Sequence, residues 1–158
     1  MLRGTTGVLG LILVSAGLCG EPPLVPLTAC EVMHDLPALD GKPAAVLGRY
    51  SFRQTGRWIG EQECTPAGAD QPQILLVEDS AAPRPPDSYE LDAAAVDRKF
   101  ADVRRHTTLG KFRFGSPEYD RWAVVYGRIE SRKGEDAKKA PANLVFRGSG
   151  VVIFLTPQ

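Results

Sequence analysis

The chain has 158 residues, 43% of them hydrophobic and 24% charged, which fits one globular domain and argues against a disordered chain or a membrane bundle. Lysine plus arginine equals aspartate plus glutamate at 19 each, and this balance excludes a strong overall field for nucleic acid or acidic lipid. The 16 glycines and 13 prolines often separate apolar runs, a pattern that favours a β-rich fold with frequent turns.

The N-terminus has the pattern of a bacterial-type signal peptide. Arg3 supplies a positive charge, residues 8–18 are mostly apolar, and small residues lie close by, ahead of a Pro-Pro pair. The apolar stretch is too short to cross a bilayer as a helix, which needs about 20 residues. We therefore expect residues 1–20 to be cleaved and the mature chain to be exported, periplasmic or secreted, without a transmembrane span. A buried N-terminal helix of the mature fold is the alternative.

The number of cysteines left after cleavage leads to a second prediction. Cleavage after Cys19 would leave Cys30 and Cys64, the even number that an oxidising compartment favours, and we expect these two to form a disulfide. Cleavage after Gly17 would instead keep Cys19 and make the pairing ambiguous. A lipoprotein anchored at Cys19 is a further alternative, although Leu18 stands where such a site takes a small residue. Two inert buried thiols are the alternative to the bridge.

The mature chain begins with a Pro-rich connector, expected at residues 21–29, and continues as a single domain over 30–158. Thr28 and Glu31 have the spacing of a capping box, which predicts a helix of one or two turns. Pro37 ends that helical pattern.

Five strands are expected, joined by turn-forming segments. The first has Val46, Tyr50 and Phe52 on one face and Arg49, Ser51 and Arg53 on the other. Internal glycines in the first and fourth strands, Gly48 and Gly127, indicate bends or bulges. A polar loop at 131–139 precedes the last strand. The expected strands are 44–52, 58–64, 73–77, 122–130 and 151–155.

One long helix is expected at residues 92–106. Asp92 is a favourable N-cap residue. Val96, Phe100 and Val103 repeat at helical spacing, so they predict a buried face.

This element order resembles the oligonucleotide/oligosaccharide-binding (OB) fold. In that fold a helix lies between the third and fourth strands of a five-stranded Greek-key barrel, and the long first strand is bent. The resemblance covers about residues 41–155 and implies a mostly β barrel that the main helix plugs, with a mobile loop at 131–143. An open α+β sheet with the helix on one face is the alternative.

The resemblance implies a binding surface on the barrel, and exposed aromatic rings beside arginines would supply one. The densest cluster of large polar-tipped residues is Tyr119 to Trp122. Trp58 shares strand parity with Cys64 and is expected to point inward, and for Trp122 and Tyr126 core packing is the alternative. The candidate binding residues are Arg49, Arg53, Arg57, Tyr119, Arg121, Trp122, Tyr126 and Arg128.

No motif for a cofactor or metal is present in the sequence, so none is expected. We expect an exported, non-catalytic binding module for a protein or glycan partner, and export argues against nucleic acid. One alternative is a small hydrolase that uses His34 or His106, which needs one of these within about 4 Å of a catalytic-type side chain in a pocket. Glu61 and Glu63 alternate as on a solvated strand face. A purely structural envelope protein is the other alternative.

Overall fold

The structure is a computed structural model that describes residues 20–64, 72–87, 89–148 and 151–157. The predicted signal peptide, residues 1–20, lies outside this part of the chain except for Gly20, and so does the alternative lipid anchor at Cys19. None of the helices described is long and apolar enough to cross a membrane. In chain order the elements are β1 (Leu27–Thr28), α1 (Ala29–His34), α2 (Leu36–Leu39), β2 (Pro43–Arg53), β3 (Gly56–Gly60), β4 (Gln73–Glu78), α3 (Ala93–His106), β5 (Tyr119–Ser131), α4 (Glu135–Lys139), β6 (Ala142–Phe146) and β7 (Val152–Leu155).

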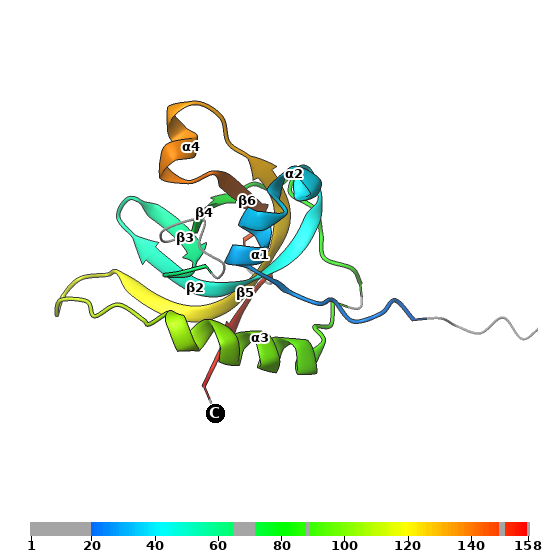
Figure 1. Ribbon diagram of the computed structural model, residues 1–158, viewed down its shortest axis with the longest axis horizontal. Coiled ribbons are helices and arrows are strands. Elements are labelled where there is room, and N and C mark those ends of the chain that lie inside the picture. Colours follow the sequence, from blue (N-terminus) through cyan, green and yellow to red (C-terminus); the bar gives the residue numbers. More distant parts are fainter. Residues whose placement is uncertain (1–19, 65–71, 88, 149–150, 158) are drawn as a thin grey trace, which may run out of the picture.

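Five of the strands close into a barrel (Figure 1). β2 pairs with β3 on one edge and with β5 on the other, and the circuit continues from β3 through β4 and β6 to β5. The β4–β6 pairing is parallel, and the other four are antiparallel. α3 comes between the third and fourth of these strands in the sequence. The predicted mostly β fold with a five-stranded barrel and one main helix is confirmed, and closure rules out the open sheet.

The last barrel strand differs from the expectation. It is β6, whereas the segment expected as the fifth strand forms β7, which pairs with β5 beyond the end of β6. The loop expected at 131–139 contains the short helix α4. β6 was missed because its apolar run, Leu144 to Phe146, is short and follows a polar loop.

The two internal glycines allow neighbouring backbones to approach closely. A Cβ atom on Gly48 would lie 2.8 Å from the carbonyl oxygen of Gly60, and one on Gly127 would lie 2.5 Å from that of Val145. Both separations are shorter than a carbon–oxygen contact tolerates, so any side chain there would push the strands apart. These positions therefore need glycine because of barrel closure.

Each barrel strand has an inner face, which includes the fully buried Ile59, Ile74 and Leu144, and an outer face. Residues that pair across two strands lie on the same face. Trp58 pairs with Ser51 and alternates with Ile59, so it lies on the outer face, partly buried. The expectation that Trp58 points inward was wrong.

α3 covers the outer face of β2 and β5 (Figure 1). Phe100 packs edge-on against Trp122, with ring centroids 5.5 Å apart. Trp122 alternates with Ala123, whose partner on β2 is Gly48, and so projects away from the barrel interior. Val103 on the same helix face is fully buried. The predicted apolar face is confirmed, but the helix lies outside the barrel and does not plug it.

The short helices lie at one end of the ring. α1 contacts β2 and β3, α2 contacts β5, and Val32 of α1 is fully buried. The capping box of Thr28 and Glu31 is confirmed, with both of its hydrogen bonds formed. Leu27 and Thr28 also pair with β2 as the parallel strand β1, so segment 21–29 is partly built into the sheet.

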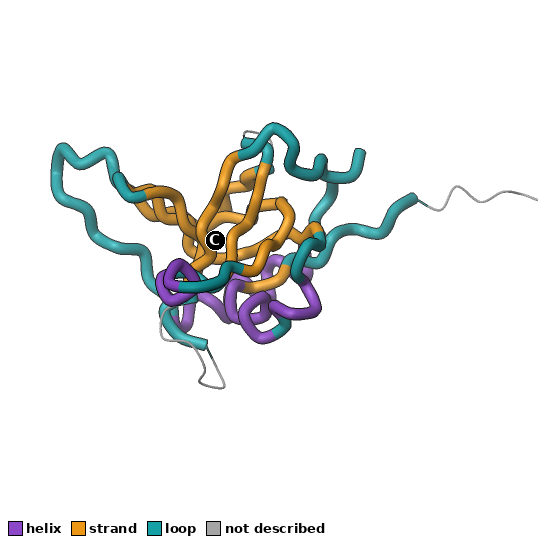
Figure 2. The backbone as a smooth tube through the Cα atoms, turned by 90° about the horizontal axis from the view of Figure 1, so that it is seen from above, coloured by secondary structure: helices purple, strands orange, loops and turns teal. Residues whose placement is uncertain are grey.

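Residues 107–118, between α3 and β5, form a loop that extends away from the strands in both views (Figures 1 and 2). Phe114 near its tip is fully exposed. Arg53 contacts the middle of this loop, where its guanidinium lies 4.3 Å from the centroid of the Phe112 ring.

Candidate binding surface

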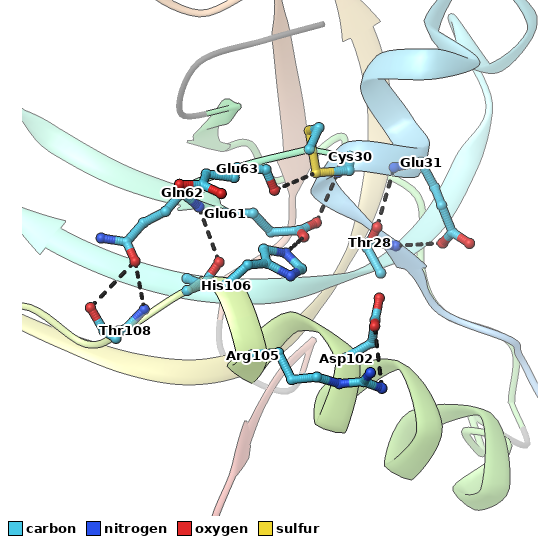
Figure 3. A network of polar contacts seen from close by, with 12 residues as sticks. Thr28, Cys30, Glu31, Glu61, Gln62, Glu63, Asp102, Arg105, His106 and Thr108 are labelled. Carbon is cyan, nitrogen blue, oxygen red and sulfur yellow. Dashed lines mark hydrogen bonds and ion pairs between the residues drawn. A yellow bond between two sulfur atoms is a disulfide. The ribbon is translucent and has the colours of Figure 1, made fainter. Parts of the chain in front are cut away.

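The carboxylate of Glu61, which was expected on a solvated strand face, is buried and joins three parts of the chain just beyond β3 (Figure 3). Its side chain is 2% exposed, and Oε1 accepts a hydrogen bond from the backbone N–H of Cys30 at 2.9 Å. Its Oε2 lies 2.7 Å from Nε2 of His106, the last residue of α3. Cys30 is itself bonded to Cys64, with Cα atoms 5.4 Å apart, so the predicted disulfide is confirmed.

A second set of hydrogen bonds fixes the same corner. The Gln62 N–H donates to Oγ1 of Thr107 at 3.0 Å, and the Thr108 N–H donates to Oε1 of Gln62 at 2.9 Å. These reciprocal bonds hold the end of β3 against the end of α3. The corner is therefore a cross-linked joint in which the buried polar atoms of Glu61 and Thr107 have partners.

The two histidines bear on the hydrolase hypothesis. Nδ1 of His34 lies 2.7 Å from Asp35, but both side chains are largely exposed, at 82% and 60%. His106 reaches a carboxylate, yet both oxygens of Glu61 already have partners within the joint. Among the residues described, no serine, threonine or cysteine side chain is hydrogen-bonded to either pair, and no three metal-ligating side chains gather. The geometry gives the His106–Glu61 pair a tethering role.

The two candidate arginines of β2 lie on the outer face, and both form hydrogen bonds to other segments of the chain. Arg49 donates to the carbonyl of Thr108 at 2.9 Å. Arg53 forms an ion pair with Asp120 at 2.7 Å, and that carboxylate, 1% exposed, also accepts from Ser51. These contacts secure β2, β5 and the base of the 107–118 loop to one another.

Three further candidates are also used internally. Trp122 and Tyr126 are only 5% and 6% exposed, and both belong to the hydrophobic core. Arg128 donates twice to the Glu130 carboxylate, at 2.9 and 2.7 Å. Trp122 and Tyr126 therefore present no free ring face to solvent, and the guanidinium of Arg128, whose side chain is 34% exposed, is held by Glu130.

The remaining candidates meet on the inner face at one end of the barrel, where β2 and β5 extend past its closed part. Tyr119 stacks on Phe52 with centroids 5.4 Å apart and planes 9° apart. Tyr50 lies 6.1 Å from Tyr119 and makes an edge contact with Phe154 of β7 at 5.7 Å. We call this set the aromatic–arginine surface; its members are Tyr50, Phe52, Arg57, Tyr119, Arg121 and Phe154.

Two arginines border this surface. The guanidinium of Arg121 lies 4.1 Å from the centroid of the Phe154 ring. Arg57 lies 6.0 Å from the ring of Phe52 and pairs with Glu78 at 3.1 Å. Both geometries allow cation–π attraction, which leaves guanidinium N–H groups at the edge of the rings.

The surface combines exposed and buried parts. Tyr119 and Phe154 are 37% and 41% exposed, whereas Tyr50 beneath them is 5% exposed. Burial, followed by the neighbouring Tyr119, raises the pKa of the Tyr50 hydroxyl, so this group stays neutral well above physiological pH. The exposed rings therefore rest on a fixed apolar base.

A groove of about 400 Å³ adjoins this surface on the other side of β7. One wall is α3, and the other is the end of the chain from β7 onward. Its lining residues are Val96, Asp97, Phe100, Ala101, Arg104, Phe154, Leu155 and Thr156.

The structure thus brings three predicted binding residues together, Arg57, Tyr119 and Arg121. Sequence reasoning missed Phe154, the most exposed ring of the surface. Tyr50 and Phe52 were not among the candidate residues either, and the strand alternation that groups them on one face was the signal that could have identified them. Comparison with known proteins finds no matching family, no similar curated protein and no similar solved structure.

Proposed function

We propose that this chain is an exported, non-catalytic binding module that holds a protein partner on the aromatic–arginine surface. The observation that carries the proposal is the exposure of Tyr119 and Phe154 on a stacked base, with Arg121 beside them. Tyrosine and arginine are enriched among the residues that dominate protein–protein binding energy. A cluster that is already packed loses little side-chain entropy when a partner covers it.

A protein partner is favoured over a glycan because the rings are stacked on one another. Tyr119 has one face against Phe52, and Phe154 lies under Arg121, so neither ring offers a wide open platform for a sugar. A glycan array carrying common envelope and extracellular sugars is the matching control. If the chain bound a glycan saturably and Arg121→Ser abolished that binding, the partner would be a sugar and the protein-partner proposal would be wrong.

The fold and location are part of this proposal. The strand order β2-β3-β4-β6-β5, with α3 between the third and fourth strands and a parallel pairing between the third and fifth, supports an OB-like barrel. The Cys30–Cys64 bridge supports an oxidising compartment, because disulfides persist there and are rare in the cytosol. Loss of about the first 20 residues, measured by mass spectrometry of the exported protein, tests the signal peptide.

Site-specific photo-crosslinking tests the partner. A photoreactive phenylalanine analogue at position 119 should capture one defined protein in cells, and the same analogue at Lys139, exposed on α4, should not. Arg121→Ser should remove the crosslink, whereas Arg105→Ser, a matched change on an exposed α3 arginine, should leave it. Equal crosslinking from both positions, or none from either, would contradict the proposal.

A further inference from the structure

Among the described residues, β7 ends the sheet and its outer edge is open. β7 pairs with β5, and no other strand among the described residues pairs with it. The N–H of Tyr126 donates to the carbonyl of Val151 at 3.0 Å, which marks a hydrogen-bonded pair. Alternation along an antiparallel ladder then turns the N–H and C=O groups of Val152 and Phe154 away from β5. These backbone groups form a template for one more strand.

Both sides of that open edge carry features that would hold the side chains of an added strand. On the outer face lies the groove, where Asp97, Ala101 and Arg104 repeat along α3 at helical spacing. On the inner face lie Phe154 and Arg121 of the aromatic–arginine surface. Successive side chains of a strand point to opposite faces, so one added strand would contact both sets.

We propose that the partner supplies an extended peptide segment that pairs with the open edge of β7. This rests on the proposed function and specifies how the partner binds. Main-chain hydrogen bonds to Val152 and Phe154 would provide affinity, and alternating side chains would provide specificity.

The charges at this edge define the chemistry of the segment. Arg104 and Arg121 contribute two cations against the single carboxylate of Asp97. The small side chain of Ala101 leaves room between α3 and β7 for an apolar group. The segment that fits is therefore apolar at the position facing Ala101 and carries a carboxylate near one of the arginines.

The test starts from a phage-displayed library of random linear peptides selected on the exported protein, followed by titration of the best synthetic peptides by fluorescence anisotropy. Val152→Pro removes one outward N–H, and Val152→Ala shortens the same side chain but keeps it. We expect the proline variant to weaken binding about tenfold relative to the alanine variant, the effect of one lost hydrogen bond with its partner left unpaired. Selected peptides should be enriched in acidic residues beside apolar ones.

A measurement on the unaltered protein covers the case in which the proline variant does not fold. N-methylation of alternate peptide amides should abolish binding in one register and spare it in the other. Hydrogen exchange should slow at the amides of Val152 and Phe154 when peptide binds. Equal binding to both Val152 variants, protection at other sites, or a library without saturable binders would overturn the proposal.

Two outcomes separate this inference from related ones. If the crosslinked partner is lost in Arg121→Ser but binds the folded Val152→Pro and Val152→Ala variants equally, the binding surface stands and strand addition fails. If the amides of Val152 and Phe154 become protected without peptide as protein concentration rises, a second copy of the chain occupies the edge, and the peptide assignment is overturned.

Discussion

The two faces of the β2–β5 ribbon use arginine in different ways. On the outer face, Arg49 and Arg53 bind a carbonyl and a buried carboxylate of the same chain. On the inner face at the open end, Arg121 lies over an exposed ring with its N–H groups at the surface. The residue type is the same, and strand parity decides the role: on one face the arginines join segments of the scaffold, and on the other lies the surface that we propose binds the partner.

The largest expected effect is on the outer face, at Asp120. Asp120→Ala should lower the free energy of unfolding by about 3 kcal/mol, because it leaves Arg53 and Ser51 without their shared acceptor. Urea denaturation of the wild type and the variant measures this. Asp120→Asn, which keeps one acceptor oxygen, is the control and should cost less. A loss below about 1 kcal/mol would mean that the outer-face arginine is not a scaffold element.

Arg53→Ser should have the next largest effect, a loss of about 2 kcal/mol, since it removes charge-assisted hydrogen bonds to Asp120 and to the carbonyl of Tyr119. A double-mutant cycle with Asp120→Ala isolates the pair. A coupling energy of at least about 1 kcal/mol is expected. Strict additivity would show that the two side chains act separately.

Tyr89, whose ring contacts Tyr126, is an exception near the outer face, because its buried hydroxyl packs there without a hydrogen-bond partner among the described residues. Tyr89→Phe should therefore raise the free energy of unfolding by about 1 kcal/mol at neutral pH. Thermal or urea unfolding measures this, and destabilisation of that size would reveal a bond that the hydroxyl makes.

The same substitution should change the response to alkali. Burial, followed by the nearby Tyr126, raises the pKa of Tyr89 to about 12. The unfolded-state pKa is near 10, so this ionisation does not change the free energy of unfolding below about pH 10. The free energy of unfolding then falls as pH rises toward 12, because the unfolded chain loses the proton before the folded one does. Tyr89→Phe should show a smaller fall in the urea midpoint over this range, and an identical fall would contradict the assignment.

The smallest expected effect is on the inner face. Arg121→Ser should change the free energy of unfolding by no more than about 0.5 kcal/mol, because the side chain is exposed and its described contact is the ring of Phe154. The same urea experiment that tests Arg53→Ser gives a direct contrast of one substitution on two faces. A loss as large as that of Arg53→Ser would make Arg121 part of the scaffold as well.

Much of the fold could be predicted because local patterns and topology agree. The helical repeat of Val96, Phe100 and Val103 located α3. The internal glycines, which were expected to mark bends or bulges, lie where neighbouring strands approach closely. β6 was missed because its apolar run is short and follows a polar loop, and only the pairing with β4 and β5 makes it the barrel strand. Pairing partners far along the chain are not encoded in a local pattern.

The candidate site was less accessible from sequence for the same reason. Alternation placed Tyr50 and Arg49 on opposite faces of β2, but it could not show which face the helix would cover. Asp120 has the appearance of a solvated loop-edge acid until Ser51, 69 positions away, is placed beside it. Burial by distant segments thus separates scaffold residues from surface ones.

The position of the Cys30–Cys64 bridge has a consequence for the order of assembly. Both sulfur atoms precede β4, β5 and β6, so the bond encloses only α1, α2, β2 and β3 in a covalent ring. In a chain that enters its compartment from the N-terminus, this ring can form while β5, which pairs with the other edge of β2, is still absent. Thiol trapping during oxidative refolding of a Trp58→Phe variant should find the bond formed before the fluorescence of Trp122 reports the packing of β5, and the reverse order would contradict this. The barrel would then close when β4, β5 and β6 are added to a segment that the disulfide has already linked covalently.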